Sequence, residues 1–163
     1  GRSFRYDCVG TVCAAYYYAC IDLESRFGKY TWNGVARLYA YAADLSRLTT
    51  AKKPEPGDII FWDNTYDRNG DGKWNDELTH CGIVYRYYEN GTIDYIHLNY
   101  AKGIILERMN LYYPDVDVHT HDTQRYRINS PMRMRSHRYL NPQQWLASHL
   151  FRAFGAIHAA YSY

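Results

Sequence analysis

Apolar residues follow a helical spacing in the first part of this chain. Between residues 35 and 48 they recur every three or four positions, which predicts an amphipathic helix. These residues are Val35, Leu38, Tyr39, Ala42, Leu45 and Leu48. An apolar and aromatic run over residues 8–20 predicts an earlier helix, and Asp7 precedes it as a capping acceptor. We expect a loop containing Gly28 between the two helices.

Later apolar runs are short and bounded by turn residues, which is typical of strands. The pattern predicts a buried strand over residues 59–62 and an antiparallel hairpin over residues 79–88 and 92–99 that turns at Asn90-Gly91. Residues 103–108 predict a further strand. Because helices come first and strands follow without alternation, the chain is predicted to be α+β, with N-terminal helices packed on an antiparallel sheet.

The pattern weakens beyond residue 110. Residues 110–138 are polar and charged, as solvated loops are, although a strand near residues 126–128 fits the sequence. Asn141-Pro142 resembles a helix start. Residues 150–163 fit either an extension of that helix or a final strand. We expect a single domain over residues 1–163, with its core at about residues 5–109 and a C-terminal extension over residues 110–163.

Composition and charge exclude several kinds of partner. The 163 residues are 47% hydrophobic and carry 19 basic and 17 acidic side chains, so a net charge of +2 gives no field for nucleic acid. The chain has no apolar run of about 18 residues that would predict a transmembrane segment, and no signal-peptide pattern opens it. Its 19 tyrosines suit either a groove for sugars, peptides or partners, or a sheet surface.

Cys8 is the strongest candidate for chemistry. It opens the first predicted helix, where backbone N–H groups and the helix dipole favour a thiolate, although a buried structural cysteine is the plainer alternative. A thiol nucleophile needs an imidazole to take its proton and a polar group to orient that imidazole. We expect His80 to be the base, because Gly82 beside it permits close approach. His97 or Asn99 is then the orienting group.

Strand register argues against this arrangement. If the hairpin is ideal, His97 faces Val84 and lies about four residues from His80 along the ribbon, which is too far for contact. A bulge, strong twist or a shifted register closes such a gap. The other cysteines suggest no bridge within the first helix, because Cys13 and Cys20 lie about 10 Å apart on a helix.

Four motifs in order resemble the NlpC-type cell-wall cysteine peptidases. The first, Asp7-Cys8-Val9-Gly10-Thr11-Val12, is similar to the nucleophile motif of that family, and residues 56–62 are similar to one of its core strands. Residues 79–84 are similar to the motif that carries the base, and residues 95–97 are similar to the strand that carries the third polar residue. The resemblance implies a papain-like core in which Cys8 attacks, His80 is the base, His97 orients it, and the neighbourhood of Cys8 and Asp7 supplies the oxyanion site.

Some positions depart from that family. Val9 stands where it has a small serine, Cys81 replaces an aliphatic residue, and residues after 110 have no counterpart. The related CHAP amidases share the order of cysteine and histidine but usually place an acidic or amide residue third. His97 therefore favours the NlpC type, and Asn99 keeps the CHAP type open.

An acidic loop before His80 predicts a calcium site. Residues 67–77 follow the first half of an EF-hand spacing, in which alternate oxygens wrap a hard cation. The predicted ligands are Asp67, Asn69, Asp71, the carbonyl of Lys73, and either Asp76 or Glu77 as the closing carboxylate. A metal-free acidic turn is the alternative. No organic cofactor is expected.

The residues alone indicate acyl transfer by a thiol, and the resemblance implies a secreted or periplasmic endopeptidase of the bacterial cell envelope. It would cleave amide bonds in peptidoglycan stem peptides through an acyl-enzyme on Cys8. An N-acetylmuramoyl-alanine amidase and a toxin that attacks a rival's wall use the same core. A non-catalytic module that binds wall polymer or a partner is the rival from another class, and it predicts an ordinary thiol at Cys8.

Overall fold

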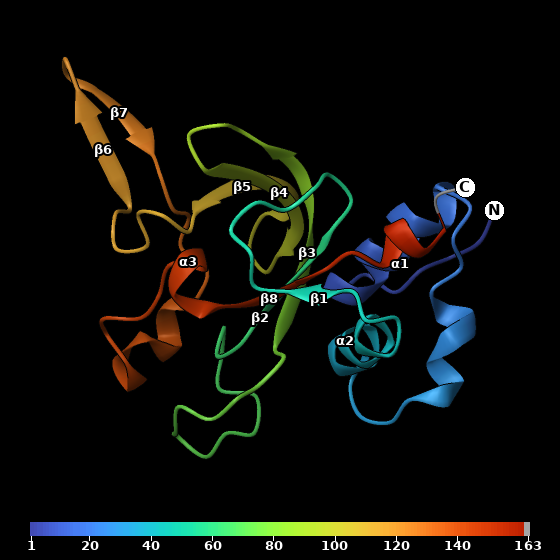
Figure 1. Cartoon of the computed structure of the whole chain (residues 1–163). Coiled ribbons are helices and arrows are strands. Elements are labelled where there is room, and N and C mark those ends of the chain that lie inside the picture. The colour runs from blue at the N-terminus through green and yellow to red at the C-terminus, as the bar shows by residue number, and fades with distance from the viewer. Residues whose placement is uncertain (162–163) are drawn as a thin grey trace.

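The structure is a computed structural model that describes residues 1–161, and it packs helices against an antiparallel sheet (Figure 1). The helices are α1 (Cys8–Tyr18), η1 (Glu24–Lys29), α2 (Gly34–Asp44), η2 (Arg135–Leu140), α3 (Ala147–Leu150) and η3 (Ile157–Ala160), where η marks a 3₁₀ helix. The strands are β1 (Leu48–Thr49), β2 (Ile59–Trp62), β3 (His80–Tyr87), β4 (Thr92–Asn99), β5 (Gly103–Asn110), β6 (Val118–His121), β7 (Gln124–Arg127) and β8 (Phe151–Gly155). The predicted α+β class is confirmed.

The main sheet has the order β1-β8-β2-β3-β4-β5, and every neighbouring pair is antiparallel. Its last strand in sequence, β8, therefore lies between β1 and β2. The sequence of residues 150–163 fitted either a helix extension or a final strand, and the structure forms the strand β8 there. Ser162 and Tyr163 lie outside the described residues. The division into a core at residues 5–109 and an extension stays a prediction, but the sheet itself includes β8.

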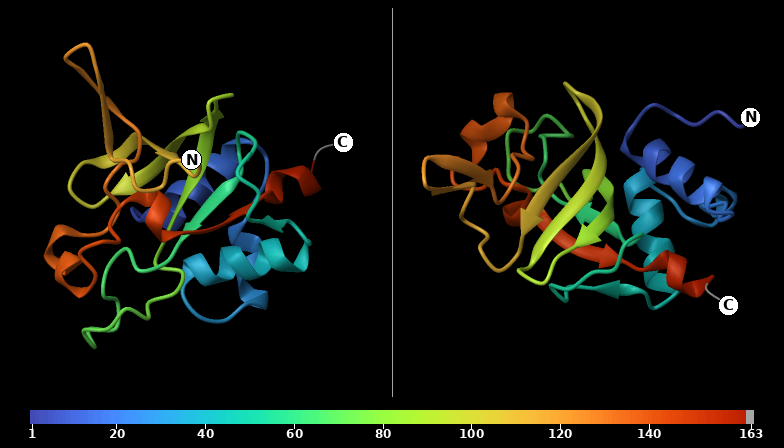
Figure 2. Two further views of the ribbon diagram at one scale, coloured as in Figure 1. Left: turned by 60° about the vertical axis from the view of Figure 1, so that its left-hand side comes forward. Right: turned by 90° about the horizontal axis from the view of Figure 1, so that it is seen from above.

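Strand β2 is buried on both faces because it separates two hydrophobic cores. Ile59 and Phe61 pack with α1 and α2, whereas Ile60 and Trp62 pack into the core on the opposite face. This alternation is what a strand with a period of two residues requires when both faces are covered. Figure 2 shows the helices α1 and α2 on one side of the sheet and the segment with α3 on the other.

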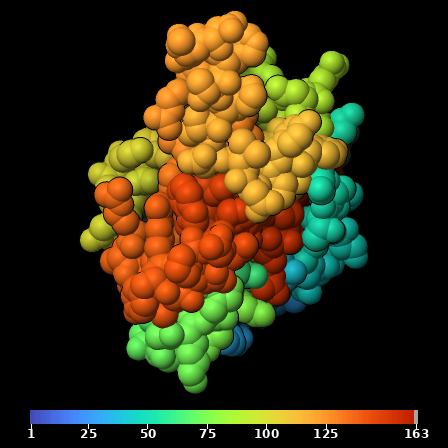
Figure 3. All heavy atoms as spheres, turned by 90° about the vertical axis from the view of Figure 1, so that its left-hand side faces the viewer, coloured from blue at the N-terminus to red at the C-terminus, as the bar shows by residue number. Residues whose placement is uncertain are grey.

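The second face of the sheet is covered by residues that follow β5. Leu111, Ala147 and Leu150 are buried there against strand residues such as Tyr95 and Phe154. Figure 3 shows this face, with the segment that includes α3 across its centre and the β6–β7 hairpin rising above it. The hairpin is a separate two-stranded sheet, and its side chains are almost all exposed.

Two helix predictions need correction. The predicted helix beginning at Asn141-Pro142 is wrong for most of its length, because only Ala147–Leu150 is helical. The preceding backbone pairs instead with residues 130–133, for example through Met132 N–H to Trp145 O. The helix expected over residues 35–48 ends at Asp44, and Leu48 begins β1. No helix among the described residues is long and apolar enough to cross a membrane.

Candidate active site

Cys8 is the first residue of α1, as predicted. Asp7 caps the helix: its backbone is extended and its side chain accepts a hydrogen bond of 2.7 Å from Gly10 N–H. A Cβ at Gly10 would lie 1.9 Å from the carbonyl oxygen of Arg5, so only glycine allows the preceding chain to cross here. The Asp7 carboxylate is thus a cap that occupies Gly10 N–H, and the N–H groups that precede Gly10 in the helix are the available oxyanion donors.

The two histidines are in contact, because the hairpin departs from the ideal register in which His80 and His97 would lie too far apart. Ile83 pairs with Ile96, and the register shifts between Val84 and Arg86. Two differences from the ideal hairpin produce this pairing: the turn spans residues 89–91, since Tyr88 N–H donates to Thr92 O, and the register then shifts by one further residue. His97 on β4 consequently lies across from Gly82 on β3. Because Gly82 is two residues after His80, the side chains of His97 and His80 lie on the same face of the sheet.

Gly82 makes the approach of the two imidazoles possible. A Cβ on this residue would lie 2.8 Å from the carbonyl oxygen of Ile96 and 3.1 Å from His97 Cβ. It would also lie 3.2 Å from the ring of Trp62. The prediction that Gly82 permits close approach therefore has a direct structural basis: β3 and β4 meet where a side chain is missing.

A chain of hydrogen bonds fixes the imidazole tautomers. The Glu107 carboxylate accepts from His97 Nε2 over 3.1 Å, and His97 Nδ1 lies 2.8 Å from His80 Nε2. Since an ionised carboxylate can only accept, the network assigns the His97 proton to Nε2 and makes Nδ1 an acceptor for His80 Nε2–H. The arrangement leaves His80 Nδ1 as the nitrogen available to the thiol of Cys8.

Glu107 is the participant that sequence reasoning missed. It lies on β5, where Tyr95 is its partner on β4 and Ile105 is the partner of His97. Glu107 and His97 are therefore diagonal neighbours on one face, and the Glu107 side chain is only 12% exposed. The available signal was a carboxylate directly after the apolar residues 104–106 of the predicted strand.

The environment of Cys8 favours its thiolate. Hydrogen bonding from the thiol of Cys81 is the largest cause that lowers the pKa of Cys8 well below its ordinary value, and His80 lowers it further. Burial opposes this shift. The same contact, together with complete burial, raises the pKa of Cys81, so Cys81 stays a neutral donor. Burial lowers the pKa of His97, and Glu107 opposes that change.

Asn99, the alternative orienting residue, is occupied elsewhere. Its side-chain oxygen accepts hydrogen bonds from the backbone N–H groups of Ala101 and Lys102 in the turn after β4. The structure thus brings His97, and not Asn99, to His80. Cys13 is buried and its pKa rises to about 12, chiefly through burial, and all four cysteines are free.

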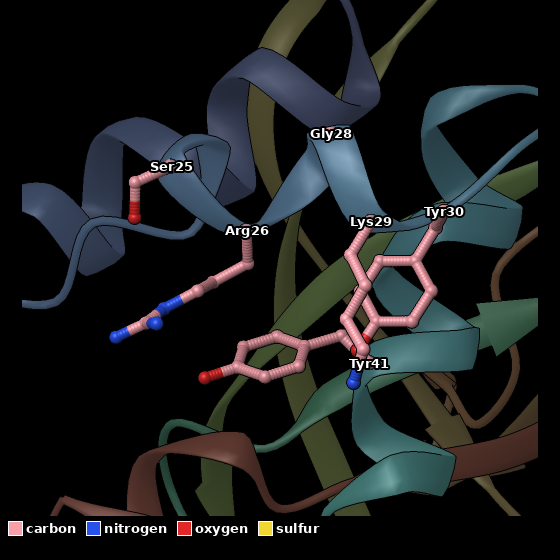
Figure 4. A pocket seen from close by; sticks show the side chains of 6 residues that line it. All are labelled: Ser25, Arg26, Gly28, Lys29, Tyr30 and Tyr41. Atoms are coloured by element: carbon pink, nitrogen blue, oxygen red, sulfur yellow. The ribbon is translucent and has the colours of Figure 1, made fainter.

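A cleft of about 630 Å³ opens beside Cys8. Its walls come from the start of α1, from the turn before α2 and from the loop between β2 and β3, and they include Trp32, Arg37 and Arg68. A separate cavity of about 380 Å³ lies between η1 and α2 (Figure 4). Two residues of its lining, Lys29 and Tyr30, both bond to Asp44, so these side chains belong to a structural ion pair.

The loop that is predicted to bind calcium forms turns that are held by hydrogen bonds from backbone N–H groups. Asp67 accepts from Gly70 N–H and Gly72 N–H, and Asp71 accepts from Lys73 N–H. The other predicted ligands are the Lys73 carbonyl and Asn69, whose side chain accepts from Asp71 N–H. Of the two alternatives for the closing carboxylate, Glu77 lies 3.6 Å from Arg152, and Asp76 is buried.

Asp76 is the loop residue that best suits a cation. It is 1% exposed, and neither of its carboxylate oxygens has a hydrogen-bond partner. The pKa of Arg133 nearby is lowered by burial, an effect that the Asp76 charge opposes. Among residues 1–161, however, no three His, Cys, Asp or Glu side chains are grouped to hold a metal ion. Calcium therefore stays a prediction.

Helices packed on an antiparallel sheet, with a thiol at a helix start beside an imidazole pair, define the class of papain-like hydrolases. The CHAP domain family matches residues 2–99, more than half of the chain, so the chain belongs to this family. Membership implies hydrolase activity on peptidoglycan, as an amidase or peptidase in the general sense. The narrower NlpC type is not shown. No curated protein and no solved structure was found to match the chain.

Proposed function

We propose that this chain cleaves amide bonds in peptidoglycan stem peptides through a covalent acyl-enzyme on Cys8. The observation that carries the proposal is the hydrogen-bonded series from His80 through His97 to Glu107, next to a thiol of lowered pKa. A thiolate paired with an oriented imidazole is what nucleophilic acyl transfer needs. A binding module would have no use for this arrangement.

The steps follow from the positions of the protons. Cys8 Sγ attacks the carbonyl carbon of the amide, and the N–H groups at the start of α1 donate to the developing oxyanion. The His80 imidazolium gives its proton to the leaving nitrogen, which leaves a thioester on Cys8. His80 then takes a proton from water, which attacks the thioester and releases the acid and the Cys8 thiolate, so the thiolate–imidazolium pair is restored. His97 and Glu107 hold the imidazole throughout.

The first experiment measures the rate of iodoacetamide labelling of Cys8 against pH by mass spectrometry. Fast labelling that persists well below pH 7 and is lost in His80→Ala supports the activated pair. Labelling that rises only near the free-thiol pKa of about 8.5 contradicts it and favours the non-catalytic module. Cys13→Ala is the control, because that thiol is buried in the same core.

Product analysis on purified peptidoglycan separates the remaining activities. An endopeptidase releases a new amino terminus within the stem peptide, whereas an N-acetylmuramoyl-alanine amidase releases the whole stem from the sugar. Mass spectrometry of the soluble fragments distinguishes the two. Either substrate lies in the cell envelope, which supports a secreted or periplasmic location, and fractionation of the native cells tests it.

A further inference from the structure

The cleft beside Cys8 carries positive charge that the protein itself leaves without a partner. Its two acidic residues already have cationic partners: Asp7 lies 3.0 Å from Arg5, and Glu24 lies 2.8 Å from Arg2. Arg37 and Arg68 also line the cleft, and neither has a carboxylate within 4.0 Å among the described residues. The unbalanced charge at the substrate site is therefore cationic.

Both arginines are held in place by backbone carbonyls. Arg37 donates from Nε to Trp32 O at 3.1 Å, and Arg68 donates from an Nη to Glu77 O at 3.0 Å. A guanidinium has five N–H donors, so each side chain keeps donors for a ligand. They also come from different elements, Arg37 from α2 and Arg68 from the loop between β2 and β3, so they converge only in the folded protein.

Trp32 joins the two arginines. The guanidinium of Arg68 lies 5.7 Å from the centre of its ring, and the carbonyl of Trp32 is the acceptor for Arg37. The side chain is 73% exposed although its backbone has a φ of 79°, a left-handed conformation that costs energy in a residue other than glycine. Strain of this kind collects at functional sites, where surrounding contacts maintain it.

We propose that the cleft selects peptides that carry a free carboxylate close to the scissile amide, with Arg37 and Arg68 binding that carboxylate and Trp32 contacting the adjacent apolar part of the peptide. Guanidinium groups bind carboxylates in planar, charge-assisted pairs, so a neutral carboxamide at the same place loses most of this interaction. The inference rests on the proposed function for the identity of the bond cut. Beyond the proposed function, it specifies that the substrate carries a negative charge next to the bond that is cut.

The test uses two synthetic stem peptides that differ only in a free carboxylate or a carboxamide beside the scissile amide. Titration calorimetry with the inactive Cys8→Ala protein measures binding of each peptide without turnover. We expect the carboxylate peptide to bind at least about tenfold more tightly, with a difference that shrinks as salt is added. Arg37→Gln and Arg68→Gln should each reduce the difference, and the double variant should abolish it.

Arg86→Gln is the matched control, because Arg86 also lies over an aromatic ring, that of Tyr88, but on β3 outside the cleft. It should leave the preference unchanged. Equal affinities for the two peptides, or a preference that survives in the double arginine variant, overturn the inference. Hydrolysis of the two peptides is measured separately, with the protein that retains Cys8. Hydrolysis of both peptides at equal kcat/KM contradicts this inference alone, whereas selective binding without any hydrolysis contradicts the proposed function alone.

Discussion

The Glu107 carboxylate decides which nitrogen of each imidazole carries a proton. Replacing it in Glu107→Gln removes the charge that stabilises the imidazolium chain and allows His97 to adopt the other tautomer. We expect kcat to fall by about 10²-fold, the lower part of the range for general acid–base catalysis. KM should change little, because Glu107 does not line the cleft. Steady-state kinetics on a soluble stem peptide measures both.

Glu89→Gln is a suitable control, since it removes an exposed carboxylate from the turn between β3 and β4. A role for Glu107 in folding alone would change the amount of active protein and leave kcat per titrated Cys8 unchanged. That result would contradict its function as an orienting residue.

Cys81 gives a second prediction at the scale of one residue. It donates to the Cys8 thiolate, so in Cys81→Ala the pKa of Cys8 should rise, by about one unit for the loss of one charge-assisted hydrogen bond. The acidic limb of the kcat/KM profile and of the labelling rate should both move to higher pH. Cys13→Ala removes a thiol from the same core without this contact. An unshifted profile in Cys81→Ala would show that His80 alone sets the thiolate.

At the scale of elements, the pairing of β3 with β4 is what assembles the site. In Gly82→Ala the new methyl would meet the Ile96 carbonyl at 2.8 Å, and backbone cannot move aside as a flexible side chain does. We expect a loss of about 1–3 kcal/mol in the free energy of unfolding, typical of overpacking, together with loss of activity. Denaturant titration and peptide hydrolysis measure the two effects.

Gly28→Ala controls for the glycine substitution itself, because nothing lies within 4 Å of a Cβ at that position. If Gly82→Ala retained full activity, the close approach of β3 and β4 would not be needed for the contact between His80 and His97.

Sequence patterns predicted the elements that depend on neighbouring residues. The helix cap at Asp7 and the turn at Asn90-Gly91 are local signals, and both appear where they were expected. The contact between His80 and His97 depends instead on the exact residues that close this turn, Tyr88 and Thr92, and on a register shift next to Tyr85, which shows no glycine or other local mark. Glu107 was missed for a related reason, because its role needs the register of a third strand.

The acidic loop between β2 and β3 gives a prediction about metal removal. Ca²⁺ should raise Tm and a chelator should lower it, because Asp76 is a buried carboxylate without a hydrogen-bond partner that a cation can neutralise. At a concentration about 100 times Kd, a ligand adds about 2.7 kcal/mol to stability. Thermal melts with Ca²⁺, Mg²⁺ and chelator measure the effect.

The variant Asp76→Asn should remove the response to Ca²⁺, whereas Asp122→Asn, in the exposed β6–β7 turn, should retain it. Identical Tm values with Ca²⁺ and with chelator would identify the loop as an acidic turn without metal. The hydrogen bonds from backbone N–H groups to Asp67 are consistent with that alternative.

At the scale of the whole molecule, the family match ends at residue 99 but the fold does not. Strand β8 lies between β1 and β2, with Ile60 facing Phe154 in the register, and the second core is closed by residues that follow β5. No local pattern in residues 111–150 predicted this arrangement. Their contacts with the sheet are distant in sequence, and their backbone follows no regular period that hydrophobic spacing would reveal.

The position of β8 inside the main sheet and the exposure of the β6–β7 hairpin predict opposite results for two deletions. A chain ending at residue 109 loses β8 and uncovers Trp62 and Tyr95, which are fully buried, so it should not unfold cooperatively and should bind a dye for exposed apolar surface. Replacing residues 118–127 by a short glycine linker removes strands whose side chains are almost all exposed and should leave Tm within a few degrees. Calorimetry compares the two with the full chain. A cooperative transition in the first variant would mean that the papain-like core folds without its last strand, and the second face of the sheet would then need another explanation for its apolar residues.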